Sequence, residues 1–261
     1  MRRHRKLISK RRYTVPFAIW IVAGTVIPIL TIAYYGITNR NGAFTFENIT
    51  AMFNSQHLEA LAMSLLLSVV STVVCLVLAF PMALILRESR FGKQGFMIFV
   101  FILPMWMNFL LRTMAWQVLL ERQGVINSVL TSIGLNRQEM MGTPGAVVLG
   151  MVYDFLPFMV LPIYNVVSKI DNRLIEAAYD LGAGKFYVFR RVIFPLSIPG
   201  IASGVTMVFI PALTTFVISN MLGGGKVNLI GNIIEQEFTV NSNWYLGSGL
   251  SLVMMVFIIV S

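Results

Sequence analysis

The chain has 261 residues, of which 57% are hydrophobic and only 12% are charged, and its mean hydropathy is +0.77. Soluble domains are usually about 45–50% apolar and about 25% charged, so this composition excludes an ordinary soluble domain. The sequence holds one cysteine, Cys75, and two histidines, His4 and His57. These counts exclude a disulfide framework, a cysteine-based zinc site and an iron–sulfur cluster, and they argue against a histidine-built metal or haem site.

Long uncharged stretches predict an all-α polytopic membrane protein with about six transmembrane helices. A stretch such as 60–86 is longer than the ~20 residues that cross a bilayer. We expect the first span to remain as a signal anchor, because it is too long for a signal peptide and lacks a small-residue cleavage site. The last span has 16 residues up to Ser261, so either the sequence stops inside a helix or the natural chain continues. The expected spans are 15–37, 60–86, 96–119, 145–168, 195–221 and 246–261.

The distribution of lysine and arginine predicts the orientation of these spans. Seven of the twenty Lys and Arg residues lie in the first twelve positions, three lie in 87–95 and five in 169–194, whereas the alternate connections together hold four. Cytoplasmic loops are the ones enriched in Lys and Arg, so we expect a cytoplasmic amino terminus. We interpret residues 1–14 as a basic cytoplasmic tail rather than a nucleic-acid-binding segment, and residues 15–261 as a single transmembrane domain.

The segment 169–194 is patterned as a helix, a turn and a second helix. Asp171 is a suitable N-cap for the first helix. A glycine-rich stretch, 182–184, resembles a helix C-terminus, and we expect Pro195 and Pro199 to end the second helix. An apolar stripe at helical spacing predicts a docking surface; it consists of Leu174, Ala177, Ala178 and Leu181.

Within this segment the residues carry a spaced motif. In chain order it is Glu176-Ala177-Ala178, three residues, Gly182, nine residues, then Val192-Ile193-Phe194-Pro195. It resembles the cytoplasmic loop of ABC importer permeases, which is Glu-Ala-Ala, three residues, Gly, nine residues, Ile, one residue, Leu-Pro. Val192 and Phe194 replace the Ile and the Leu with other apolar groups. Over the whole chain, the sequence is similar to the B-type permease subunits of bacterial spermidine/putrescine importers.

This resemblance implies a type I ABC importer permease fold in the bacterial inner membrane, with a cytoplasmic coupling helix that seats on an ATPase. It implies a polyamine pathway shared with a homologous second permease subunit. Two copies of a cytoplasmic ATPase and a periplasmic polyamine-binding protein would complete the complex. The ATPase-coupling positions carried over from the motif are Glu176, Ala177, Ala178, Asp180, Gly182 and Pro195.

The chain carries no phosphate-binding loop of its own. Such a loop needs Gly, four residues, then Gly-Lys-Ser/Thr, and the nearest stretch, 223–228, lacks the hydroxyl residue. We therefore expect no catalytic residue, metal ligand or cofactor in this chain, with ATP and Mg used by the partner ATPase.

Two ionisable residues fall inside the expected spans, and such residues are functional candidates by default. On the expected boundaries Asp154 lies ~14 Å into its span, near mid-membrane, and Arg112 lies at a height that differs by roughly 8 Å. Asp154 is a candidate for holding a polyamine ammonium, with Tyr153, Phe155 and Phe158 offering ring faces. The alternative role for Asp154 is an internal salt bridge to Arg112 or a hydrogen bond to a neighbouring span.

Other function classes remain as alternatives. An ABC importer permease for another small solute would share the coupling motif. An ion-coupled secondary carrier usually has paired intramembrane carboxylates and internal repeats, and neither is evident. An intramembrane enzyme would need a cluster of reactive side chains, but the expected spans offer Arg112 and Asp154 as their ionisable residues.

Overall fold

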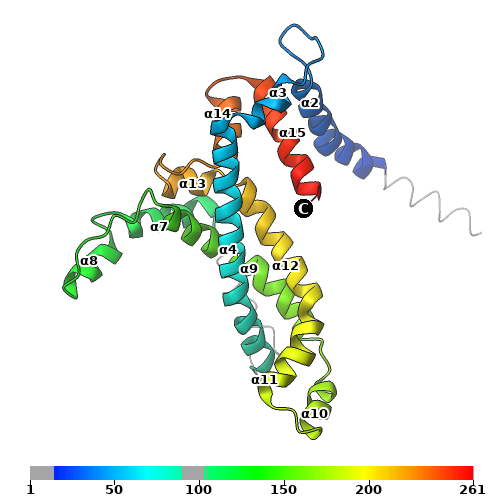
Figure 1. Cartoon of the computed structure of the whole chain (residues 1–261), viewed down its shortest axis with the longest axis vertical. Helices are drawn as coiled ribbons and strands as arrows, with labels where there is room; N and C mark the ends of the chain where they lie inside the picture. The colour runs from blue at the N-terminus through cyan, green and yellow to red at the C-terminus, as the bar shows by residue number, and fades with distance from the viewer. Residues whose placement is uncertain (1–14, 90–102, 104, 261) are drawn as a thin grey trace, which may run out of the picture. The chain divides into compact units, whose positions relative to one another are not determined.

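The computed structural model describes residues 15–89, 103 and 105–260 (Figure 1). Most of these residues are helical, and the β pairing among them is an isolated bridge between Thr38 and Phe44. The predicted all-α class is confirmed. Several sequence predictions fall outside the described residues: the basic tail 1–14, the loop residues Arg90 and Lys93, residues 96–102 and 104 of the third expected span, and Ser261.

The chain divides into two compact units, each described by itself below. Unit 1 consists of residues 1–58 and 233–261, and unit 2 of residues 59–232. Helices α4, Ser55–Glu88, and α14, Ile230–Thr239, cross the boundaries between the two units in sequence.

Among the described residues, four helices are long and apolar enough to cross a membrane. Three of them match the spans expected at 15–37, 60–86 and 145–168. The fourth covers part of the fifth expected span, and a shorter apolar helix, α15, Trp244–Val260, covers most of the sixth. The four long helices are Val15–Gly36, Ser55–Glu88, Pro144–Val167 and Lys185–Thr214.

Unit 1 is built on the packing of α2, Ile27–Gly36, against α15. A π-helical turn, η1 (Val22–Val26), precedes α2, and the short elements α3 (Glu47–Thr50) and η2 (Ala51–Phe53) also pack on α15. The rings of Tyr35 and Tyr245 meet edge to face at 5.3 Å between centroids.

Unit 2 contains an extensive interface between α9, Pro144–Val167, and α12, Phe194–Thr214 (Figure 1). Their interface is fully buried at Met159, Val208 and Ala212. A Cβ on Gly204 would lie 2.7 Å from Met159 Sδ, so the small residue allows the close approach that membrane helices favour. Besides residues 59–88 of α4, unit 2 also contains α7 (Phe109–Leu120), α8 (Val125–Ser132), α10 (Asn172–Asp180), α11 (Lys185–Val188), η3 (Phe189–Ile193) and α13 (Val217–Leu222).

The fifth expected span differs from its prediction at both ends. Pro195 and Pro199 do not end a helix, because α11, η3 and α12 form one continuous helix from Lys185 to Thr214. Pro195 lies inside this continuous helix, just after the π-helical turn η3, which already interrupts the regular i→i−4 hydrogen-bond pattern. The expected continuation to residue 221 is also wrong, since the chain is extended at Thr215 and resumes as α13.

The third expected span, 96–119, is interrupted in its described part. Met107 and Asn108 are not helical, and α7 begins at Phe109. The Asn108 side chain accepts a hydrogen bond from Leu110 N at 2.8 Å. This N-cap starts a new helix within an apolar stretch that hydropathy alone treats as continuous.

Candidate functional site

The turn after α10 has the geometry that its glycines predict. Asp171 caps the helix, accepting a hydrogen bond from Arg173 N at 3.0 Å, which confirms its predicted role. At the other end, Gly182 N donates to Tyr179 O at 2.9 Å and Ala183 N donates to Ala178 O at 3.1 Å. This pair of bonds is the Schellman motif, in which the residue directly after the helix C-cap adopts a left-handed conformation. Gly182 has φ +80°, so the motif accounts physically for a glycine at this position.

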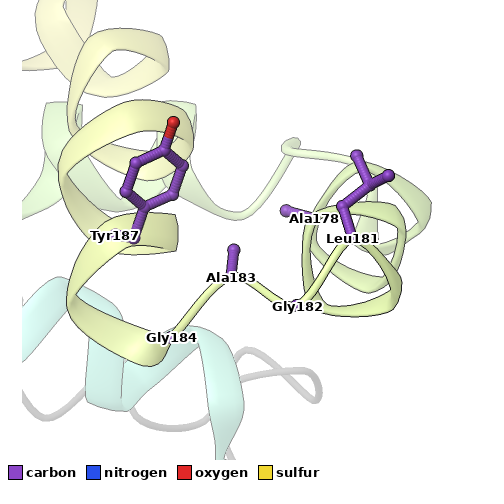
Figure 2. A pocket seen from close by; sticks show the side chains of 6 residues that line it. All are labelled: Ala178, Leu181, Gly182, Ala183, Gly184 and Tyr187. Atoms are coloured by element: carbon purple, nitrogen blue, oxygen red, sulfur yellow. The ribbon is translucent and has the colours of Figure 1, made fainter.

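A groove of about 440 Å³ opens beside this turn. Figure 2 shows Ala178 of α10 and Leu181, which directly follows α10, on one side and Tyr187 from α11 on the other, joined by the link through Ala183. Leu181 is 88% exposed and Tyr187 is 57% exposed. An apolar groove with such exposed walls is typical of a surface that binds another protein. We call it the α10–α11 groove; its lining is Ala178, Leu181, Gly182, Ala183, Gly184 and Tyr187.

The predicted coupling residues are distributed around this groove rather than all inside it. Ala178 and Gly182 line it. Glu176, Ala177 and Asp180 are exposed on α10, and Pro195 is exposed near the start of α12.

The groove is attached to the membrane helices at two places. Arg87, in the last turn of α4, donates hydrogen bonds to Ile170 O at 3.0 Å and to Asn172 Oδ1 at 2.7 Å, at the beginning of α10. The ring of Phe80 on α4 meets the ring of Phe189 at 5.7 Å and that of Phe194 at 5.9 Å, where α11 leads into α12. These contacts join the groove to both α4 and α12. Sequence reasoning treated Arg87 as a topology signal alone.

A second cavity, of about 400 Å³, lies where α7, α9 and the end of α12 meet. Its lining includes both ionisable residues of the spans and four phenylalanine rings. Both helix breaks lie beside it, since α7 starts at Phe109 and α12 stops at Thr214. We call it the Asp154 cavity; its lining is Phe109, Arg112, Asp154, Phe155, Phe158, Pro211, Thr214, Thr215, Phe216 and Val217.

Asp154 is held by two residues of α7. Its Oδ1 lies 3.4 Å from Arg112 Nε, with the two side chains 2% and 8% exposed, and its Oδ2 accepts a hydrogen bond from Thr113 Oγ1 at 3.2 Å. The alternative role foreseen for Asp154, an internal salt bridge, is therefore observed. The height difference of roughly 8 Å expected from the sequence does not keep the two side chains from meeting.

The four predicted pathway residues do not all share one cavity. Asp154, Phe155 and Phe158 line the Asp154 cavity. Tyr153 lines a separate apolar cavity of about 430 Å³, where its ring meets that of Trp116 at 5.4 Å. Consecutive residues of a helix face about 100° apart, which explains the separation.

Sequence reasoning missed a buried residue that shapes the Asp154 cavity. The amide of Asn232, 4% exposed, donates to Phe216 O at 3.1 Å and to Asn220 Oδ1 at 2.6 Å. It accepts from Ser219 Oγ at 2.6 Å and from Leu229 N at 2.9 Å. These bonds fix the break that places Phe216 in the cavity wall. The signal available in the sequence was that Asn232, a polar residue, stands between the apolar residues Ile230 and Ile233.

Comparison with known proteins agrees with this architecture. Residues 63–261 match the family described as "Binding-protein-dependent transport system inner membrane component". The spermidine/putrescine transport system permease protein PotB of Haemophilus influenzae is 36% identical over 96% of this chain and 92% of its own length.

Two solved structures share the fold. A chain of a bacterial ABC transporter involved in the import of the acidic polysaccharide alginate has a TM-score of 0.83 and 17% identity, and the match covers 98% of this chain and 93% of that one. In a second structure, that of the alginate transporter in complex with a pentasaccharide-bound periplasmic protein, the chain has a TM-score of 0.82 and 16% identity over 98% of this chain and 92% of its own length. The predicted ABC importer permease fold is thus confirmed. The chain belongs to the family of inner membrane components of binding-protein-dependent transport systems.

Proposed function

We propose that this chain is the permease subunit of an ATP-driven importer that moves polyamines such as spermidine and putrescine into the cytoplasm. The observation that carries the proposal is the Asp154 cavity, in which a carboxylate lies beside four phenylalanine rings inside a membrane protein. The 36% identity to a spermidine/putrescine permease along nearly the whole chain supports the same cargo.

The chemistry of the cavity suits an aliphatic amine. A carboxylate accepts hydrogen bonds from an ammonium group, and aromatic faces attract the same cation through their quadrupoles, most strongly when water is excluded. Apolar walls also suit the methylene stretches between the nitrogens of a polyamine. Asp154, Phe155 and Phe158 are the proposed pathway residues predicted from sequence, and Phe109 and Phe216 join them.

The α10–α11 groove is the proposed contact for a separate ATPase. Its exposed apolar walls favour an interface, and the bonds from Arg87 and the contacts of Phe80 offer a route from that interface to α4 and α12. In this proposal the ATPase uses the ATP and Mg, a homologous permease completes the pathway, and a periplasmic polyamine-binding protein delivers the cargo. The groove and the amino terminus then face the cytoplasm, as the lysine and arginine distribution predicts.

The test is uptake of radiolabelled spermidine and putrescine by vesicles that contain the permease with its proposed partners. We expect ATP-dependent uptake that excess unlabelled polyamine abolishes and neutral sugars leave unchanged. Asp154→Asn should reduce uptake at least about tenfold, because the neutral amide loses the charge–charge attraction in a water-poor cavity. Glu139→Gln removes the same charge at an exposed position and serves as the control.

Two outcomes would contradict the proposal. ATP-dependent uptake of a different solute, with polyamines inert, would identify an importer for that solute. Polyamine uptake driven by an ion gradient without ATP would identify a secondary carrier. If Asp154→Asn transports polyamines like the wild type, the cavity is not the pathway.

A further inference from the structure

The contact between Arg112 and Asp154 leaves much of the bonding capacity of both side chains unused. Charge-assisted N–H···O bonds are normally about 2.7–2.9 Å long, whereas Arg112 Nε lies 3.4 Å from Asp154 Oδ1. Within the described part of the chain, Arg112 Nε, Arg112 Nη1 and Asp154 Oδ1 are buried without a hydrogen-bond partner. The two charges neutralise each other without being well matched.

A poorly matched pair still has a clear effect on the empty cavity. A lone carboxylate this deep in a membrane protein is costly and attracts any small cation. With Arg112 beside it, the cavity has no net charge in the absence of cargo. An ammonium group that reached Asp154 Oδ1 at ordinary hydrogen-bond distance would form a better contact than Arg112 does.

The cavity also offers Arg112 another position. Helix α12 ends at Thr214, and both Thr214 and Thr215 line the same cavity as Arg112. The last four carbonyl groups of a helix lack partners within it and carry the negative end of its dipole. The polar residues Thr214 and Thr215 thus lie in the cavity that a guanidinium displaced from Asp154 would enter.

We propose that Arg112 is a built-in substitute for the cargo: its guanidinium occupies Asp154 when the cavity is empty, and an ammonium group of the polyamine displaces it. This inference rests on the proposed polyamine function. The return of Arg112 to Asp154 then expels the cargo, because both cations compete for one carboxylate. Arg112 thus weakens binding and speeds release.

The experiment measures spermidine binding and uptake separately. Equilibrium dialysis of radiolabelled spermidine against the purified permease–ATPase complex, without the binding protein, gives affinity at the membrane site, and vesicle uptake gives turnover. In Arg112→Gln the competitor is absent, so we expect spermidine to bind at least about fivefold more tightly, the lower end of ordinary coupling between competing ligands, while maximal uptake falls. Arg122→Gln, at an exposed turn, should change neither quantity.

The Asp154→Asn background shows whether the two residues act on one site. There, Arg112→Gln should no longer tighten binding, because the carboxylate for which the two cations compete is gone. A merely structural ion pair predicts the opposite pattern, in which Arg112→Gln weakens binding and uptake together and Arg112→Lys restores both.

Arg112→Lys covers the case in which the glutamine variant does not assemble. An ammonium is more strongly hydrated than a guanidinium and leaves a buried carboxylate more readily, so we expect spermidine to bind about twofold more tightly or better. Unchanged or weaker binding in the assembled variants overturns the inference even when the wild type binds spermidine through Asp154. Failure of the wild type to bind or transport polyamines overturns the proposed function itself.

Discussion

The α10–α11 groove and the Asp154 cavity lie in the same unit, yet their residues come together in different ways. The groove is built from residues 178–187, so its shape follows from a short helix, a left-handed glycine and the next helix. The cavity combines residues from 109 to 217, and two breaks in apolar helices shape it. A local motif thus specifies the proposed ATPase contact, whereas long-range packing specifies the proposed polyamine contact.

The largest expected effect tests the α10–α11 groove. Gly182→Val places a β-branched side chain at φ +80°, where open space surrounds the Cβ but the backbone conformation itself is unfavourable. We expect the end of α10 to rearrange and ATP-driven uptake to fall by about tenfold or more, because a side chain at this φ strains the backbone. Vesicle uptake, with membrane insertion checked by immunoblot, measures it.

Gly184→Ala is the matched control for this change. Gly184 has φ −72° and nothing within 4 Å of an added Cβ, so any residue is tolerated there. Equal losses in the two variants would show that the groove wall, and not the left-handed turn, carries the effect.

The next effect tests the Asp154 cavity through the buried amide of Asn232. Asn232→Leu removes four hydrogen bonds and leaves Phe216 O and Leu229 N without these partners, at a cost of about 2–4 kcal/mol. We expect a clearly lower melting temperature of the purified complex and weaker spermidine binding. The same substitution at the exposed Asn136 should leave melting unchanged. Weakened melting with normal binding would mean that Asn232 stabilises the fold without shaping the cavity.

A smaller effect separates the two cavities beside α9. Phe216→Leu removes one ring from the Asp154 cavity, and the loss of one cation–π contact should weaken spermidine binding about threefold to fivefold. Tyr153→Leu should stay within about twofold of the wild type, because its ring packs on Trp116 in another cavity. Equilibrium dialysis distinguishes them, and the reverse order would place the pathway on the Tyr153 side.

The smallest effect concerns the link between groove and membrane helices. Arg87→Gln removes a partly buried hydrogen bond to Ile170 O and an exposed one to Asn172 Oδ1, so we expect a decrease of about twofold to threefold in uptake per ATP hydrolysed. Arg190→Gln, at an exposed position on η3, is the control. An unchanged ratio of uptake to hydrolysis would indicate that the aromatic contacts of Phe80 suffice.

Sequence alone predicted the helical class, the span positions at 15–37, 60–86 and 145–168, the Asp171 cap and the break at Gly182. These features depend on hydropathy and on bonds between residues a few positions apart, which a linear pattern displays. The predicted roles in ATPase coupling remain predictions for all six residues, which are Glu176, Ala177, Ala178, Asp180, Gly182 and Pro195.

Only the tertiary structure decided which side chains share a cavity. It paired Arg112 with Asp154, placed Tyr153 in a different cavity, brought in Phe109 and Phe216, and continued a helix through Pro195. The reason is that rotation around α9 and the exact start of α7 set these contacts, and small shifts in either are invisible in an apolar sequence. Local hydrogen bonding specifies the helices and turns, whereas burial of one helix against another selects the polar groups that meet.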